Sequence, residues 1–182
     1  MSSSSSRGNP SMGDIARSVG VLGAILLVLF ALGRLLTVTP DEPVRPVDYR
    51  SAAESSRTVA TFDLYAPESL PKGWRATSVR FEPDSWHLGV LTADDDYVGL
   101  EQVRDDTGRA VERFAKASRA DGKAEIDGTT WSLRTGPRDD LTYVRRDSPE
   151  SGTASGGGMT IVVTGSAPRA VMERYISSLS GS

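Results

Sequence analysis

The most apolar part of the chain lies near its beginning, over residues 15–38. Val19–Gly33 contains no charged residue, and Arg34 stands about one turn from the end of the run. An α-helix rises about 1.5 Å per residue, so about 20 residues cross the roughly 30 Å of hydrocarbon in a bilayer. The pattern predicts a transmembrane helix over residues 15–38, preceded by a disordered cytoplasmic tail over residues 1–14.

A cleaved signal peptide is the main alternative for this segment. Ala31-Leu32-Gly33 loosely fits the small-x-small pattern of a cleavage site. No polar spacer precedes that site and the apolar run resumes at Leu35–Val38, which favours a retained anchor. Arginine residues flank the run on both sides, so charge does not decide its orientation. Similarity to signal anchors leads us to expect a single-pass protein of the cell membrane with its C-terminal domain outside.

A proline-containing stretch follows the apolar run. Pro40, Pro43 and Pro46 predict an extended linker over residues 39–57. Its polar end, Arg50–Arg57, is either further linker or a short helical turn against the domain. Residues 58–182 are then expected to form one extracytoplasmic domain, because a chain of this length can bury a sizeable core.

Short alternating segments punctuated by turns dominate the first half of this domain. Alternation of apolar and polar residues predicts strands, and Asp106 or Thr107 suits the start of a helix. The predicted elements are strands at Val59–Ala66, Thr77–Phe81, Trp86–Thr92 and Tyr97–Val103, and a helix at Gly108–Ala117.

The second half repeats this order of elements without repeating the residues. Asp127-Gly128 favours a type I′ hairpin turn, and Pro168 suits the first turn of a helix. The predicted elements are a strand through Trp131 and Leu133, strands at Leu141–Arg146 and Met159–Thr164, a mobile loop at Ser148–Gly158 and a helix from about Pro168.

Together these elements predict an α+β fold. The expected architecture is an N-terminal transmembrane helix followed by a mostly antiparallel β-sheet domain with two helices on one side. The domain would consist of two successive halves, each a run of strands followed by a helix.

Charge and cysteine content narrow the function further. Residues 1–40 carry three arginines and one aspartate, whereas the rest of the chain carries 18 basic and 23 acidic side chains. An acidic domain lacks the basic face of a nucleic-acid-binding protein, so no nucleic-acid partner is expected. The chain has no cysteine, which excludes disulfides, a thiolate nucleophile and cysteine-ligated zinc.

Three stretches of the domain carry a resemblance to a known family. They are Pro67-x-x-Leu70-Pro71-x-Gly73-Trp74-Arg75, Trp86-His87-Leu88-Gly89, and Tyr97-Val98-Gly99-Leu100-Glu101-Gln102. They resemble the actinobacterial membrane proteins grouped as domain of unknown function 4245, and the likeness extends over most of the chain. The resemblance implies a single-pass envelope protein of an actinobacterium. It implies no activity, because the family is named for lacking one.

His87 is the only histidine and therefore the first candidate for acid–base chemistry. A general base needs a partner within hydrogen-bond reach, and Glu101 is the natural one. A three-residue turn at Asp94–Asp96 would place the two residues diagonally on one face of a hairpin. A two-residue turn at Asp94-Asp95 would instead pair Leu88 with Glu101 and send Glu101 to the opposite face.

Other chemistry has weaker support. Three consecutive aspartates at a hairpin tip point in different directions, so Asp94–Asp96 is expected to be solvated rather than to bind calcium. Nucleophile-elbow, phosphate-loop and zinc motifs are absent from the sequence, and no metal or cofactor is expected. Aromatic residues are expected mainly in the core. A candidate binding surface is formed by Trp74, Trp86, His87, Tyr97 and Glu101.

The sequence therefore favours a non-enzymatic envelope module that binds a partner protein or a wall or lipid component, with the bilayer contacted by the N-terminal helix. One alternative is an extracytoplasmic hydrolase that uses His87 with Glu101. A meeting of these two residues in a concave pocket would favour that alternative. A third hypothesis is a scaffold subunit of a membrane complex.

Overall fold

The computed structural model of the 182-residue chain describes residues 12–36, 46–147 and 158–181. Contacts divide the chain into two compact units, Met1–Pro43 and Val44–Ser182. The first eleven residues of the predicted tail, the part of the predicted linker up to residue 45 and almost all of the predicted mobile loop lie outside the described residues.

The described part of the first unit is one helix, α1 (Met12–Leu36), so the predicted N-terminal helix is confirmed. Its described apolar side chains between Ile15 and Phe30 are exposed, with exposed fractions between 48% at Ile15 and 70% at Leu27. Within the part of the chain that the structure describes, no helix has both the length and the hydropathy that crossing a membrane requires. The predicted membrane span is therefore not confirmed.

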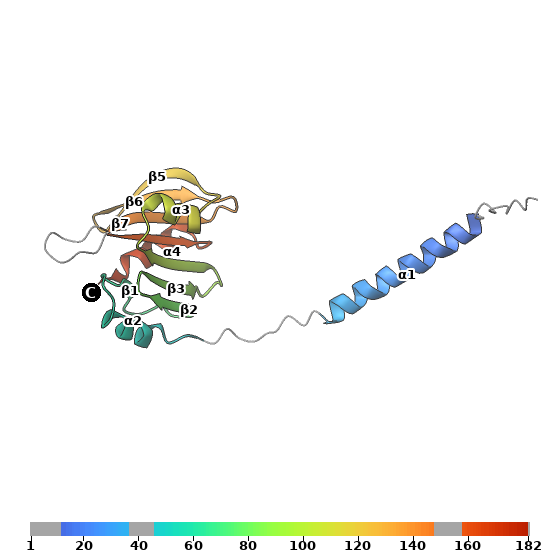
Figure 1. The fold of residues 1–182 in the computed structure, drawn as a ribbon, viewed down its shortest axis with the longest axis horizontal. Coiled ribbons are helices and arrows are strands. Elements are labelled where there is room, and N and C mark those ends of the chain that lie inside the picture. The colour runs from blue at the N-terminus through green and yellow to red at the C-terminus, as the bar shows by residue number, and fades with distance from the viewer. Residues whose placement is uncertain (1–11, 37–45, 148–157, 182) are drawn as a thin grey trace, which may run out of the picture. The chain divides into compact units, whose positions relative to one another are not determined.

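The second unit is built on a seven-stranded sheet in which all neighbouring strands are antiparallel, as predicted (Figure 1). From one edge to the other, the strands are β2 (Arg75–Glu82), β3 (Ser85–Leu91), β4 (Tyr97–Val103), β8 (Met159–Gly165), β7 (Leu141–Asp147), β6 (Thr129–Thr135) and β5 (Arg119–Ile126). A separate two-stranded sheet pairs β1 (Ala66–Pro67) with β9 (Leu179–Ser180).

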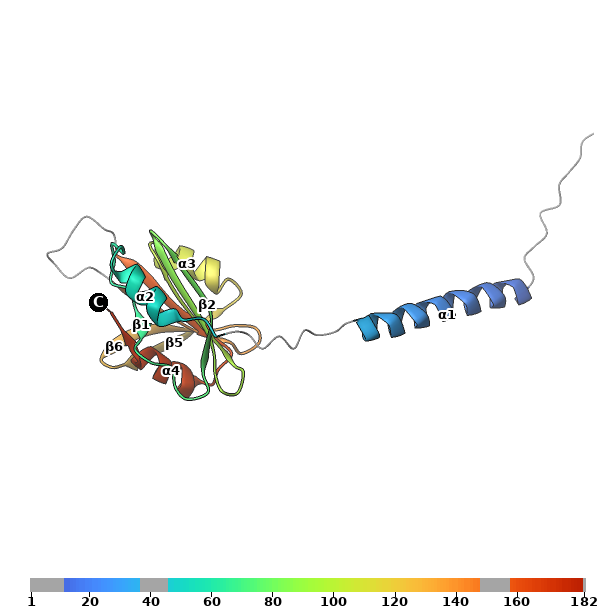
Figure 2. The same cartoon turned by 90° about the horizontal axis from the view of Figure 1, so that it is seen from below.

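Helices cover both faces of the large sheet, which corrects the prediction of two helices on one side. The described part of this unit holds three helices, α2 (Tyr49–Arg57), α3 (Thr107–Phe114) and α4 (Arg169–Ser177). Buried residues of α2 and α4 join the main core, whereas α3 packs on the opposite face through a smaller cluster (Figure 2). Single-sequence periodicity marks the apolar side of a helix but not the sheet face that it meets.

The main core lies on one face of the sheet. Trp86, Leu88 and Leu100 are fully buried there, together with Ala53 from α2 and Met172 from α4. On the opposite face, the smaller cluster joins Val144 and Val162 of the sheet to Ala110 of α3. The cluster also includes Val103 of β4, while α3 itself contacts β7 and β8.

Segment Val59–Ala66 is not a strand, apart from Ala66 in β1, so this prediction is wrong. Two of its backbone polar groups are paired with a buried side chain instead of with a neighbouring strand. The Tyr65 N–H donates to Gln102 Oε1 at 2.7 Å, and Gln102 Nε2 donates to the Asp63 carbonyl at 2.9 Å. The alternation of apolar residues here reflects packing of an irregular segment against the core.

Helix α2 lies within the stretch that the sequence assigns to the linker. Asp48 caps it by accepting a hydrogen bond from the Ser51 N–H at 3.2 Å. Tyr49 and Ala53 are buried in the main core. Arg50–Arg57 is thus helical and packed, and the folded unit begins earlier than the predicted residue 58.

The two hairpin predictions have different outcomes. Asp127 and Gly128 both have positive φ, +48° and +75°, which confirms the type I′ turn between β5 and β6. In the β3–β4 hairpin, Leu91 pairs with Tyr97 around a loop in which Asp95 has φ +64°. His87 and Glu101 are directly opposite each other, so neither of the two alternative registers is right. The two residues share one face, as in the three-residue alternative.

The outer edge of the sheet at β5 is strongly polar. Arg119, Asp121, Lys123 and Glu125 are all exposed along it. The pairing of β5 with β6 is interrupted between Ala120 and Lys123 by a bulge. The edge strand therefore carries alternating charges and a local irregularity.

Candidate functional site

A β-bulge in the edge strand β2 turns Ser78 onto the face of the sheet opposite the main core, which we call the open face. Ala76 pairs with Val90 and is buried on the core face. The register then shifts by one residue, so that Ser78 pairs with Gly89 and lies on the opposite face. Bulges of this kind re-aim side chains at sheet edges. Without the bulge, Ser78 would share the core face with Ala76, two residues earlier.

Ser78, His87 and Glu101 form a continuous hydrogen-bonded chain across three strands. Ser78 Oγ lies 2.8 Å from His87 Nε2, and His87 Nδ1 lies 2.6 Å from Glu101 Oε1. The His87 and Glu101 side chains are only 16% and 17% exposed. Direct cross-strand pairing of His87 with Glu101 fixes their approach.

The chemistry of the three groups sets the direction of each hydrogen bond. An ionised carboxylate only accepts, so Nδ1 of His87 donates its hydrogen to Glu101. In the neutral imidazole, Nε2 is then an acceptor, and the Ser78 hydroxyl donates to it. This is the connectivity that lets a histidine withdraw a proton from a serine while a carboxylate holds the ring in place.

Tyr97 covers a pair of glycines beside this chain. Gly89 and Gly99 pair directly across β3 and β4. A Cβ on Gly99 would lie 2.7 Å from the Tyr97 hydroxyl oxygen and 3.0 Å from its ring. A Cβ on Gly89 would lie within 3.1 Å of the hydroxyl oxygens of both Ser78 and Tyr97. The missing side chains therefore leave the room that brings these two hydroxyls together.

Tyr97 also interacts electrostatically with Glu101, one of the three hydrogen-bonded residues. Burial, and secondarily the negative charge of Glu101, raise the pKa of Tyr97 above its ordinary value of 10.0. The phenol therefore keeps its proton at neutral pH and is available as a hydrogen-bond donor. Tyr97 as a whole is 37% exposed.

The structure separates the five residues of the predicted binding surface into three places. His87, Tyr97 and Glu101 lie together on the open face. Trp86 points to the opposite face and is completely buried, so it belongs to the core. Trp74 stacks on Tyr175 with ring centroids 6.0 Å apart, at a different site. The pattern missed Ser78, because a bulge leaves no mark in the alternation of residues.

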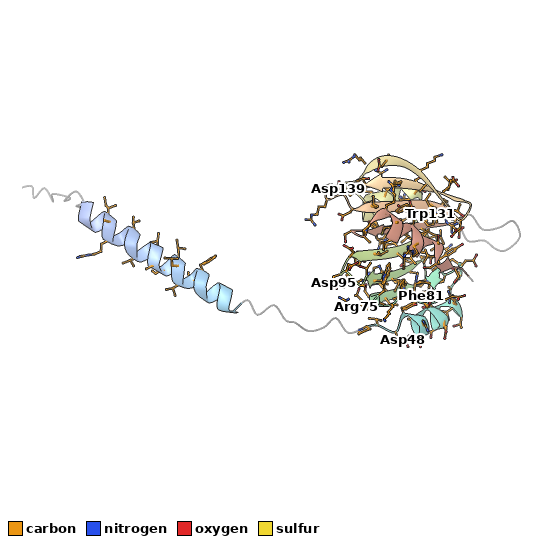
Figure 3. The ribbon with its side chains drawn as sticks, turned by 180° about the vertical axis from the view of Figure 1, so that it is seen from behind. Asp48, Arg75, Phe81, Asp95, Trp131 and Asp139 are labelled. Carbon is orange, nitrogen blue, oxygen red and sulfur yellow. The ribbon has the colours of Figure 1, made fainter. Side chains whose placement is uncertain are left out.

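Trp74 and Tyr175 line a cavity of about 270 Å³ between the end of the β3–β4 hairpin, the loop before β2, and α4. Pro71 and Val171 add apolar surface, and its charged lining residues are Asp94, Asp96 and Arg174. The neighbouring Asp95 pairs with Arg75 at the same hairpin tip, where Figure 3 shows the two side by side.

A second cavity of about 220 Å³ lies beside Arg145, whose guanidinium is 5.2 Å from the ring centroids of both Tyr65 and Trp131. Neither cavity is lined by Ser78, His87 or Glu101. His87 and Glu101 therefore meet, but on a sheet face outside both cavities. Among the described residues, no group of three or more metal-ligating side chains is gathered in one place.

Comparison with known proteins assigns the family. A family model described as a protein of unknown function, DUF4245, matches residues 7–179. The chain belongs to the DUF4245 family. This confirms the resemblance drawn from the three sequence stretches, while the actinobacterial source stays a prediction. No curated protein matches this DUF4245 chain.

Two solved structures are similar to part of the chain. One is the complex structure of Pseudomonas aeruginosa MucA/MucB, with 17% identity, a TM-score of 0.34, and coverage of 64% of this chain and 34% of that one. The other is the crystal structure of MucB in complex with MucA(peri), with 18% identity, a TM-score of 0.34, and coverage of 64% and 36%. The DUF4245 chain thus spans about a third of the solved chains that it matches.

Proposed function

We propose that this DUF4245 protein is a membrane-anchored envelope protein whose folded domain binds a partner in the cavity beside Trp74. The proposal rests on the shape and the lining residues of this cavity. Binding sites for small molecules and for single side chains are concave, mostly apolar, and hold a few convergent polar groups. Stacked aromatic rings with Asp94, Asp96 and Arg174 supply that combination in one cavity of about 270 Å³.

The wall of this cavity is fixed by the local backbone. Gly73 has φ +85°, and a Cβ on it would lie 2.9 Å from the Ala93 side chain. The loop before β2 can therefore pack closely against the hairpin tip only with glycine at this position. Tyr175 is 2% exposed, which holds its ring in one position beneath Trp74.

The anchor proposal is supported by α1. Its described leucine, isoleucine, valine and phenylalanine side chains are all about half exposed or more. A contiguous apolar surface of this kind is unfavourable in water and is stabilised by lipid or by another apolar surface. The uncharged stretch Val19–Gly33 fits lipid on every side of the helix.

Protease treatment of intact cells tests the anchor and its orientation. With a C-terminal tag on the full chain, we expect the tag to be removed by external protease while the protein stays in the alkali-washed membrane fraction. A tag that is protected in intact cells but cleaved after lysis would overturn the outside location. Release of the chain by alkali would overturn the anchor.

Site-specific photocrosslinking tests the binding cavity. A photoreactive residue replaces Ala93, which lines the cavity, in the full-length protein within native membranes. We expect a discrete crosslinked species that disappears when Trp74 is also changed to alanine. The matched control places the same photoreactive residue at the exposed turn residue Asp139. Identical products from both positions, or products that do not depend on Trp74, would contradict binding in this cavity.

A further inference from the structure

The open face of the sheet carries a second feature that the binding proposal does not use. Ser78, His87 and Glu101 are linked in series, with 2.8 Å and 2.6 Å between the bonded atoms. Each group makes the contact that its neighbour requires, since Glu101 holds Nδ1 of the imidazole and leaves Nε2 facing the serine hydroxyl. We propose that Ser78 is a nucleophile, activated by His87 and Glu101, that hydrolyses carboxylic esters. This inference is independent of the proposed binding cavity.

A structural hydrogen-bond network is the competing explanation, and three observations favour the chemical one. The first is the bulge. It places Ser78 on the face of His87, whereas regular pairing would place it with Ala76 in the core. A bulge interrupts the ladder, and at a sheet edge it is a means of directing a particular side chain.

The second observation is the choice of atoms. Ser78 contacts Nε2, and Glu101 contacts Nδ1. The carboxylate is thus on the ring nitrogen away from the serine, where it stabilises the imidazolium that forms when the serine proton is taken. A carboxylate that bonded the serine directly would leave the histidine without a role as base.

The third observation is the position of Tyr97. Its hydroxyl and that of Ser78 flank the space above Gly89, both within 3.1 Å of where a Cβ would be. When a carbonyl carbon is attacked by Ser78, its oxygen becomes negatively charged and needs a donor close by. The Tyr97 hydroxyl is the neighbouring side-chain donor and remains protonated at neutral pH.

The reaction balances with water as the only co-reactant. Ser78 Oγ forms a bond to the ester carbonyl carbon as its proton passes to His87 Nε2, and the carbonyl oxygen takes the negative charge beside Tyr97. Collapse of this intermediate breaks the bond to the alcohol, which leaves with the proton from His87. A water molecule then gives a proton to Nε2 and attacks the acyl group on Ser78. Breakdown of this second intermediate releases the acid and returns the proton to the serine.

The surroundings of Ser78, His87 and Glu101 indicate how a substrate approaches. Helix α3 contacts β7 and β8, and neither of the two cavities described above includes the three residues, so an ester reaches Ser78 over this face of the sheet rather than through either cavity. Arg80 pairs directly with His87 on the same face and is exposed. The positive charge of Arg80 therefore favours an ester that carries a negatively charged group near its carbonyl.

Covalent labelling of the full-length protein in detergent micelles tests the nucleophile. A fluorophosphonate probe reacts with activated serines, and we expect one equivalent on Ser78, identified by mass spectrometry of the digested protein. Ser78→Ala should abolish the labelling, whereas Ser132→Ala, which changes an exposed serine on β6, should leave it unchanged. A folded wild-type protein that takes up no probe, or equal labelling of Ser78→Ala, would overturn the proposal.

Three further variants distinguish catalysis from structure. His87→Ala should reduce the labelling rate at least 100-fold, and added imidazole should restore part of it, which a purely structural role would not allow. Tyr97→Phe keeps the ring over the glycines and should slow hydrolysis of p-nitrophenyl acetate about tenfold, through loss of the oxyanion donor. As a control, Arg138→Ala, which changes an exposed turn residue outside both sites, should not affect either assay. Failure of imidazole to restore His87→Ala would assign His87 to structure alone.

Discussion

Strands β3 and β4 present two different faces, although the residues alternate along the same short segments. On the core face, Trp86, Leu88 and Leu100 are fully buried against α2 and α4. On the open face, His87 and Glu101 lie beside a pair of glycines that Tyr97 covers. The comparison shows that one face supplies most of the apolar burial, which leaves the other face free to carry polar groups at little cost to stability.

The largest predicted difference in stability is between two single alanine variants at neighbouring positions, Trp86→Ala and His87→Ala. Trp86→Ala should lower the free energy of unfolding by about 3–5 kcal/mol, because a fully buried indole leaves a large cavity. His87→Ala should cost about 1–2 kcal/mol, from lost hydrogen bonds. Urea denaturation of the full chain followed by circular dichroism measures both. Equal losses would show that the two faces contribute alike.

Gln102 is the polar exception on the core face, and its replacement should have the next largest effect. Gln102→Leu leaves the Tyr65 N–H and the Asp63 carbonyl unpaired, which should cost about 2–3 kcal/mol. Hydrogen exchange should accelerate at the Tyr65 amide. Gln102→Glu should cost at least as much, because a fully buried carboxylate still accepts from the Tyr65 N–H but meets the Asp63 carbonyl oxygen without a hydrogen to donate. An unchanged rate of hydrogen exchange at the Tyr65 amide would contradict the role of Gln102 in holding this backbone segment.

On the open face, Gly99→Ala tests the packing of Tyr97. The added Cβ would meet the tyrosine hydroxyl at 2.7 Å, and displacement of the ring should cost about 1–2 kcal/mol. The same glycine change in a Tyr97→Ala background should cost much less, because the clash is gone. A double-mutant cycle measures this coupling. Additive losses would mean that the glycine serves the backbone rather than the tyrosine.

The smallest effect at neutral pH is expected at Tyr143, on the core face. Burial, and secondarily Glu173, raise the pKa of Tyr143 to about 12, from an ordinary value of 10.0. The folded state thus holds this proton more tightly than the unfolded state. Its contribution to stability is complete below pH 10 and is lost as the pH rises towards 12.

Tyr143→Phe should remove this part of the alkaline dependence, while losing at neutral pH only the 3.1 Å hydrogen bond to Glu173, or about 1 kcal/mol. Urea midpoints measured between pH 9 and 12 should therefore converge for the two proteins. Burial also raises the pKa of Tyr175, which leaves some alkaline dependence in both. If the urea midpoints of the two proteins fell in parallel as the pH rises, Tyr143 would be ruled out as a source of the alkaline dependence.

Local signals explain what the sequence could predict. The Asp127-Gly128 turn and the strands beside it are determined by neighbouring residues, and the structure confirms them. The same holds for α4, which begins directly after Pro168. His87 and Glu101 could be placed on one hairpin because each lies in a strongly patterned strand.

Non-local contacts explain what the sequence could not predict. Val59–Ala66 alternates like a strand, but the Gln102 side chain, 37 residues beyond Tyr65, takes the backbone bonds that a ladder would use. Ser78 joins His87 only through the register shift of β2 against β3. The positions of the helices on two faces depend on the completed sheet. Candidate sites made by such contacts are invisible until the strands are paired.

The charged edge strand β5 has a consequence for the behaviour of the domain at high concentration. Exposed strand edges are templates on which further chains can add, and this is a common route to aggregation. Exposed Arg119, Asp121, Lys123 and Glu125, with the bulge between Ala120 and Lys123, make β5 a poor template. Crowded copies of the domain are therefore kept from growing into a continuous intermolecular sheet from this edge.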